Sequence, residues 1–179
     1  MKIITVLISL SGVFQFSYGN PTGKIVGGED AVLGQFPHQI LWAYGDYDNV
    51  FCGGSIYNKF TIITAAHCCK AINDGFYPLN DMNIVAGRID IDDTVNGQKI
   101  SIRSYLIHPD YIGFSGGSGT YYNDICLLTL DNDLVFNENV KAIAMNNETL
   151  VADTKCSVSG WGALGVSFQF YSYILIFSF

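Results

Sequence analysis

The stretch Phe60-Thr61-Ile62-Ile63-Thr64-Ala65-Ala66-His67-Cys68 decides the fold of this chain of 179 residues. Its first five residues are aromatic or β-branched, a composition typical of a strand. Two alanines follow, and small residues at this point let the chain turn tightly and hold the imidazole of His67 against the scaffold. Because a single histidine is more often structural than catalytic, the role of His67 depends on the segments around it.

Composition and spacing indicate a globular, all-β protein. Apolar residues make up 49% of the chain, aromatic residues reach 14%, and 19 glycines are present, as expected for strands joined by turns. Strand-like runs recur about every ten residues, as in sandwiches and barrels. The candidate strands are Gln39 to Ala43, Gly53 to Ile56, Thr61 to Thr64, Met82 to Val85, Lys99 to Ile107, Ile125 to Leu130 and Cys156 to Ser159.

The N-terminus and the charge indicate where the protein acts. Residues 1–19 have the layout of a secretory signal peptide: a lysine at position 2, the apolar run Ile3 to Phe14, and small residues before a cut after Gly19. The run is shorter than the ~20 residues of a membrane helix, so we expect a secreted, extracellular protein without membrane attachment. A net charge of −7 with scattered basic residues argues against a nucleic acid partner.

Five cysteines lie beyond the signal segment, at Cys52, Cys68, Cys69, Cys126 and Cys156. Thiols pair in the oxidising compartments that secreted proteins enter. An odd number therefore leaves one cysteine without a partner in this chain. Asn147-Glu148-Thr149 is a candidate glycosylation site in such a compartment.

Four further segments accompany Thr64-Ala65-Ala66-His67-Cys68 along the chain. They are Lys24-Ile25-Val26-Gly27-Gly28, Cys52-Gly53-Gly54-Ser55-Ile56, Asn123-Asp124-Ile125-Cys126-Leu127-Leu128 and Ser159-Gly160-Trp161-Gly162. In this order the five segments resemble the signatures of the trypsin-like serine proteases, which have the chymotrypsin fold and form peptidase family S1. The resemblance implies an antiparallel Greek-key β-barrel over about residues 25–145. The peptidase domain would span residues 25–162 and include the first strand of a second barrel.

The resemblance gives catalytic roles to His67 and Asp124. A serine hydroxyl is a poor nucleophile until an imidazole takes its proton, so His67 would be the general base and later the acid that protonates the leaving amine. Asp124 would accept the other ring N–H and stabilise the imidazolium. Tyr121 is a candidate for lining a substrate subsite. His38 and His108 are assigned no role.

The resemblance also implies a zymogen that acts on protein or peptide substrates. A trypsin-like protease would cut after Lys24, removing a propeptide of residues 20–24 and freeing the amine of Ile25. The resemblance further implies that Cys52 pairs with Cys68 across the histidine loop. Cys69 and Cys126 each follow closely on a triad residue, so a second bridge between them is predicted, and Cys156 is expected to be unpaired.

The family presents its nucleophile in a Gly-Asp-Ser-Gly-Gly segment, and no such segment occurs in this sequence. We expect a product that is truncated after the start of the second barrel, lacks the oxyanion hole and specificity pocket, and is inactive alone. Two function classes remain: an incomplete serine endopeptidase, and a noncatalytic homologue that binds a protein partner. Retention of His67 and Asp124 favours the first.

The last interpretations concern the end of the chain and a loop of acidic residues. Residues 163–179 form an uncharged, mostly apolar tail, which we attribute to a truncated transcript or an erroneous gene model and not to a short membrane anchor or a native second-barrel strand. Some family members bind calcium in a loop of the first barrel, where this chain has Asp90, Asp92 and Asp93. Arg88 stands where calcium binders carry an acid, so we expect neither metal nor cofactor.

Overall fold

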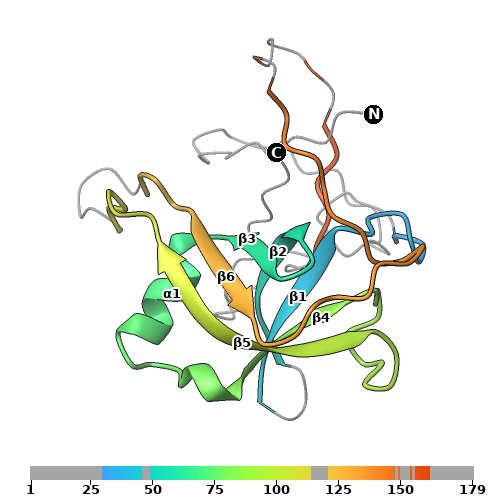
Figure 1. Cartoon of the computed structure of the whole chain (residues 1–179), viewed down its shortest axis with the longest axis horizontal. Coiled ribbons are helices and arrows are strands. Elements are labelled where there is room, and N and C mark those ends of the chain that lie inside the picture. Colours follow the sequence, from blue (N-terminus) through green and yellow to red (C-terminus); the bar gives the residue numbers. More distant parts are fainter. Residues whose placement is uncertain are drawn as a thin grey trace, which may run out of the picture.

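The computed structural model describes residues 30–45, 49–113, 121–147, 149, 154 and 156–161. Six strands close into one barrel in the order β1-β2-β3-β6-β5-β4, and every neighbouring pair is antiparallel (Figure 1). The expected all-β antiparallel barrel is thereby confirmed. The strands are β1 (Gln39–Tyr44), β2 (Asn49–Asn58), β3 (Thr61–Thr64), β4 (Met82–Ala86), β5 (Gln98–Ile107) and β6 (Cys126–Leu130).

The strand order contains a Greek key, because β1, β2 and β3 pair consecutively and β4 returns to lie beside β1. The connection from β3 to β4 holds helix α1 (Ala66–Asn73) and the 3-10 helix η1 (Leu79–Asp81). The sequence did not predict α1, since the residue at its N-cap, Ala65, offers no capping side chain. Among the described residues, no helix is long and apolar enough to cross a membrane.

Strand β1 is buried on both of its faces, which explains its apolar sequence. Ile40 and Trp42 belong to the main core inside the barrel. Leu41 and Ala43 point the other way and form a smaller cluster with Val85 of β4. Such two-sided burial removes the alternation of polar and apolar residues that marks a half-exposed strand.

The strand predicted over Cys156 to Ser159 is a wrong prediction, because these residues lie outside any strand. Each strand of the closed barrel already has two neighbours, so no edge is free to pair with another. Side chains attach the segment instead: Ser159 Oγ donates to Gln39 Oε1 at 2.9 Å, and Trp161 Nε1 donates to the carbonyl of Ile89 at 2.6 Å. The segment therefore packs on the outside of β1 and does not extend the sheet.

Glycine is required at one position of the Cys-Gly-Gly-Ser segment. A Cβ at Gly54 would lie 2.8 Å from Cγ2 of Ile62 and 2.9 Å from the carbonyl oxygen of Ile63. Both distances are shorter than a Cβ can tolerate, so only glycine lets β2 approach β3 this closely. The close approach holds Cys52, two residues earlier, near the end of β3 from which α1 begins.

Candidate active site

The register between β3 and β6 brings the two predicted catalytic residues together. Thr64, the last residue of β3, pairs with Cys126, the first residue of β6. Because the strands are antiparallel, the chain after Thr64 and the chain before Cys126 leave the barrel at the same end. His67 lies three residues beyond the first point and Asp124 two residues before the second, which explains how residues 57 positions apart meet.

His67 and Asp124 make two hydrogen bonds. Nδ1 of His67 lies 2.8 Å from Oδ2 of Asp124, and the backbone N–H of His67 donates to Oδ1 of Asp124, also at 2.8 Å. The side chain of Asp124 is 4% exposed and that of His67 is 25% exposed, so the carboxylate is buried while the ring reaches solvent. With its Nδ1–H given to the carboxylate, a neutral ring keeps Nε2 as a proton acceptor.

Asp124 also supplies the missing cap of α1. The N–H groups in the first turn of a helix have no partner within the helix, and Ala65 has no side chain that could accept from them. The bond from the His67 N–H to Oδ1 satisfies one of these donors and places a negative charge at the helix N-terminus. One carboxylate therefore holds both the imidazole and the helix that carries it.

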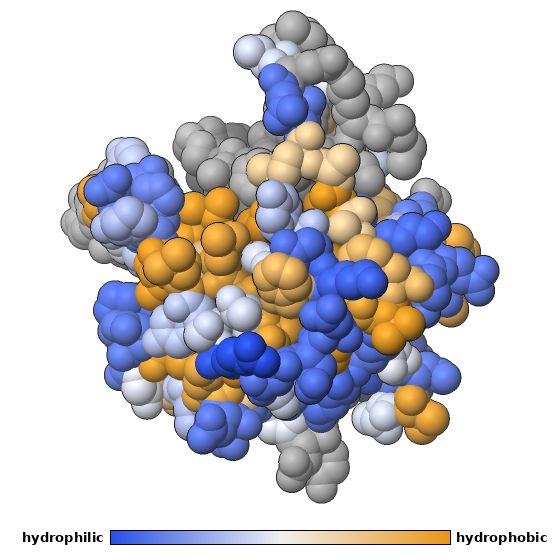
Figure 2. Space-filling view, viewed as in Figure 1, coloured by the Kyte–Doolittle hydropathy of each residue, from blue (hydrophilic) through white to orange (hydrophobic). Residues whose placement is uncertain are grey.

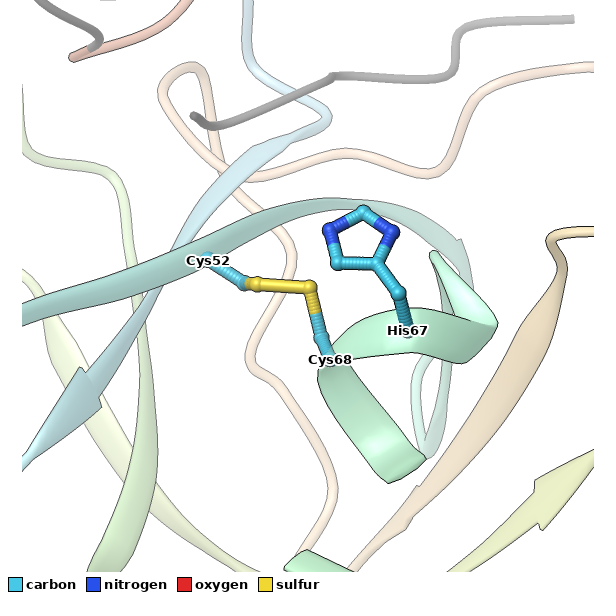
Figure 3. A group of neighbouring side chains, drawn as sticks. All are labelled: Cys52, His67 and Cys68. Atoms are coloured by element: carbon cyan, nitrogen blue, oxygen red, sulfur yellow. A yellow bond between two sulfur atoms is a disulfide. The ribbon is translucent and has the colours of Figure 1, made fainter. Parts of the chain in front are cut away.

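Two disulfides fix the first turn of α1 to the barrel. Cys68 is joined to Cys52 of β2, and Cys69 to Cys126 of β6. Figure 3 shows the ring of His67 beside the first of these bridges. Cys156 is a free cysteine in the structure, partly exposed, and its Sγ donates to the carbonyl of Thr154 at 3.3 Å.

The geometry of these residues does not make a metal centre. Cys52, His67 and Cys68 place one potential ligand atom each within 4.8 Å of one another. Cysteine binds metals as a thiolate, however, and both sulfurs are joined to each other here. The cluster is therefore a disulfide beside a histidine.

In the loop that contains Asp90, Asp92 and Asp93, carboxylate oxygens accept hydrogen bonds from residues of the same loop. Nη1 of the buried Arg88 donates to the carbonyl of Asp93. The carboxylate of Asp93 accepts from the backbone N–H groups of Asn96 and Val95 and from the Asn96 side chain, and these bonds lower the pKa of Asp93. A guanidinium thus provides the positive charge in this loop.

One tyrosine lies beside His67 and a second stacks on the first. The ring of Tyr121 lies 5.5 Å from the ring of His67, and Tyr111 stacks on Tyr121 at 6.5 Å with the planes 6° apart. Burial, together with the negative charge of Asp124, raises the pKa of Tyr111 to about 12, so its hydroxyl stays protonated at neutral pH. The sequence indicated a role for Tyr121 but not for Tyr111, whose only signal was its place three residues after His108.

Other predicted positions lie elsewhere or outside the described residues. His38 is buried with its ring edge-on to Phe36, and Nδ1 of His108 accepts from the N–H of Asp110 at 3.2 Å. Asn147 is exposed. The predicted signal peptide, the propeptide, Lys24, Ile25 and the tail over residues 163–179 all lie outside the part of the chain that the structure describes.

Comparison with protein families settles the lineage of this site. The family model described as Trypsin matches residues 25–173, most of the chain. The chain belongs to the trypsin family. Proteins of the trypsin family act in general on protein or peptide substrates, and the His67–Asp124 pair lies within the part of this chain that matches the family.

Three relatives show how much of a trypsin-family protein is present. Trypsin-1 of Astacus astacus is 36% identical over 141 residues, covering 77% of this chain and 56% of the relative. Hypodermin-A of Hypoderma lineatum is 34% identical over 173 residues, covering 90% and 60%. Trypsin zeta of Drosophila melanogaster is 36% identical over 149 residues, covering 79% and 50%. The chain thus spans between half and three fifths of the length of these curated relatives.

Proposed function

We propose that this chain supplies the base half of a secreted serine endopeptidase, with His67 as general base and Asp124 as its buried orienting carboxylate. The observation that carries the proposal is the 2.8 Å contact between Nδ1 of His67 and Oδ2 of Asp124. With the proton on Nδ1, a neutral ring has its acceptor at Nε2. Nε2 would take the proton of a serine hydroxyl as the serine attacks a peptide carbonyl. It would then return a proton to the departing amine.

The contribution of Asp124 follows from its burial. A carboxylate that is 4% exposed and bonded at both oxygens is held in place, and it stabilises the positive charge that forms on the ring when Nε2 takes a proton. Its replacement by a neutral amide would remove that charge and permit the other tautomer. The proposed substrates are proteins and peptides. Tyr121, whose ring is tilted against that of His67 and stacked on that of Tyr111, would line a subsite for them.

The proposal includes the inactivity of this sequence by itself. No Gly-Asp-Ser-Gly-Gly segment occurs in the 179 residues, and that segment would provide the nucleophile, part of the oxyanion hole and the aspartate that pairs with the amine of Ile25. The His67–Asp124 pair alone can accept a proton, but it does not itself supply a nucleophile. Hydrolysis therefore requires the residues that a full-length family member carries.

The proposed maturation has three steps. Residues 1–19 direct export and are removed, glycosylation modifies Asn147, and a trypsin-like protease cuts after Lys24 to release residues 20–24. Exposure of Asn147 and Thr149 supports the second step. In the mature chain, residues 25–162 form the peptidase domain, and the apolar residues 163–179 follow it.

A chimera tests whether the pair is a working base. Residues 25–161 of this chain are joined to the C-terminal half of Trypsin-1 from Astacus astacus, and hydrolysis of a peptide substrate is measured. We expect activity that falls about 10⁴-fold with Asp124→Asn and further with His67→Gln. A folded chimera without activity, or with activity that survives His67→Gln, would overturn the proposal and favour the noncatalytic homologue.

The unmodified chain provides the second arm of the test. An organophosphorus reagent that labels activated serines is added to the purified secreted product and followed by mass spectrometry. We expect no labelling of the chain and stoichiometric labelling of the active chimera. Stoichiometric labelling of the chain itself would show that one of its own serines is an activated nucleophile, contrary to the proposal.

A further inference from the structure

The backbone of Asn123, directly before Asp124, is in an unusual conformation. Its φ is 51°, and among the described residues it is the one position other than glycine with a positive φ. This left-handed conformation crowds Cβ against the backbone, and asparagine tolerates it better than most residues. A local outlier beside a candidate active-site residue is a reason to look for a function.

The chain is fixed on both sides of Asn123. Before it, Tyr122 and Ile112 exchange two backbone hydrogen bonds of 3.0 and 3.1 Å. After it, the carbonyl of Ile125 accepts from the N–H of His108 at 3.0 Å. The direction in which Asp124 projects is therefore decided between Asn123 and Ile125.

From Asn123 to Ile125 the chain makes a tight turn. The N–H of Ile125 donates to the carbonyl of Asn123 at 2.8 Å, so Asp124 lies at the centre of the turn. From this position its two oxygens reach the ring and the backbone N–H of His67. A right-handed conformation at residue 123 would send the following residue in another direction, because φ sets the path of the chain.

The side chain of Asn123 secures the same turn. Its Nδ2 donates to the carbonyl of Asp110 at 2.8 Å, and the N–H of Asp110 is bonded to the ring of His108. The amide therefore ties the turn to the segment that also anchors Tyr122 and Ile125.

We propose that Asn123 is a positioning residue, whose left-handed backbone and side-chain amide together aim Asp124 at His67. The proposal concerns the geometry of the pair, and only its consequence for catalysis rests on the proposed function. It predicts that substitutions at residue 123 make the hydrogen bond between Nδ1 of His67 and Oδ2 of Asp124 open more often, although both partners are still present.

Three substitutions separate the backbone contribution from the side-chain contribution. Asn123→Gly keeps access to positive φ but loses the amide. Asn123→Asp tolerates positive φ but has no N–H for the carbonyl of Asp110. Asn123→Ala loses both contributions.

The readout is the Nδ1–H proton of His67 in the ¹⁵N-labelled chain, assigned by its disappearance in His67→Gln. The rate at which this proton exchanges with water reports how often the bond to Asp124 opens. We expect exchange about tenfold faster in Asn123→Ala and a smaller increase in Asn123→Gly. Asn137→Ala is the matched control, because Asn137 is also exposed and makes a 2.8 Å bond to the backbone, but at negative φ.

Exchange in Asn123→Ala within about twofold of the unmodified chain would overturn the proposal, as would an equal acceleration in Asn137→Ala. If Asn123→Ala does not fold, Asn123→Asp decides: faster exchange supports a positioning role, and unchanged exchange contradicts it. The measurement needs no nucleophile, so it can fail while the chimera is active, or succeed while the chimera is inactive.

Discussion

At the scale of single residues, Asp124 has two tasks that are divided between its two oxygens. Oδ2 holds the ring of His67, while Oδ1 accepts from the backbone N–H in the first turn of α1. The bond to Oδ1 stabilises the fold, because α1 has no capping side chain of its own. The stability of the helix and the orientation of the ring are therefore coupled through one carboxylate.

This division predicts different effects of two substitutions on stability. Asp124→Ala removes both acceptors and should lower the free energy of unfolding by about 1–3 kcal/mol. Asp124→Asn keeps a neutral oxygen that can accept from the helix, so it should cost clearly less. Urea denaturation measures both, with the exposed Asp133→Ala as control. Equal losses for the two substitutions would show that the bond to the helix contributes nothing.

His38 predicts a dependence of stability on pH. Burial lowers its pKa below the ordinary value of 6.5, and within the described residues its Nε2 has no hydrogen-bond partner. The unfolded chain therefore binds a proton at His38 more readily than the folded chain does. Protonation of His38 has no effect on the free energy of unfolding well above pH 6.5, and it lowers that free energy as the pH drops below 6.5. The slope between pH 7 and pH 5 should be smaller in His38→Gln.

Thermal unfolding over this pH range measures the effect of His38. Both proteins keep His67 and His108, so the contributions of those groups cancel in the comparison. An identical dependence of stability on pH in the two proteins would contradict the prediction that His38 is buried and neutral in the folded protein.

At the scale of elements, the sequence predicted each of the six barrel strands, with bounds that differ at some ends. Thr61–Thr64 has the predicted bounds, and β5 begins one residue earlier than predicted, at Gln98. Helix α1 was missed because Asp124, which caps it, lies 57 positions away in the sequence. The false strand at Cys156–Ser159 had suitable residues but no strand edge to pair with.

The same limit applies to the candidate site. Motifs identified His67 and Asp124 because their neighbours in the chain are distinctive. The stacking of Tyr111 and the positive φ of Asn123 depend on how separate segments meet, which no local pattern encodes.

The two disulfides close loops of different length, and their removal should cost different amounts. Cys52–Cys68 spans 16 positions and Cys69–Cys126 spans 57. The chain-entropy model gives losses of about 3 kcal/mol for Cys52→Ala with Cys68→Ala and about 4 kcal/mol for Cys69→Ala with Cys126→Ala. Guanidinium unfolding measures both, and Cys156→Ser should change stability by less than about 0.5 kcal/mol. A larger loss from the first pair would contradict the loop-length argument.

At the scale of the whole molecule, apolar side chains remain on the outside of the barrel. Leu106 of β5 and Leu127 of β6 are direct neighbours in the ladder and are 66% and 37% exposed. Figure 2 shows apolar surface over the adjoining ends of these two strands. Ile112 and Tyr122, which pair further along the same two segments, are also exposed.

This surface predicts concentration-dependent association of the isolated chain, since adjacent exposed apolar residues favour contacts between molecules. Leu106→Lys should shift the association to higher protein concentration in sedimentation equilibrium. Val95→Lys is the matched control, because Val95 is 87% exposed but lies on the loop between β4 and β5. An equal effect of the two substitutions would show that association does not use the Leu106–Leu127 surface.

The closed barrel has a consequence for how genes of this lineage can change. Each of the six strands already has a strand neighbour on both sides, so no strand edge is left for a following domain to extend. Recombination that exchanges the second half of such a gene needs to preserve a complementary surface but no strand register. A junction placed after the barrel is therefore a point at which recombination can join modules of different ancestry.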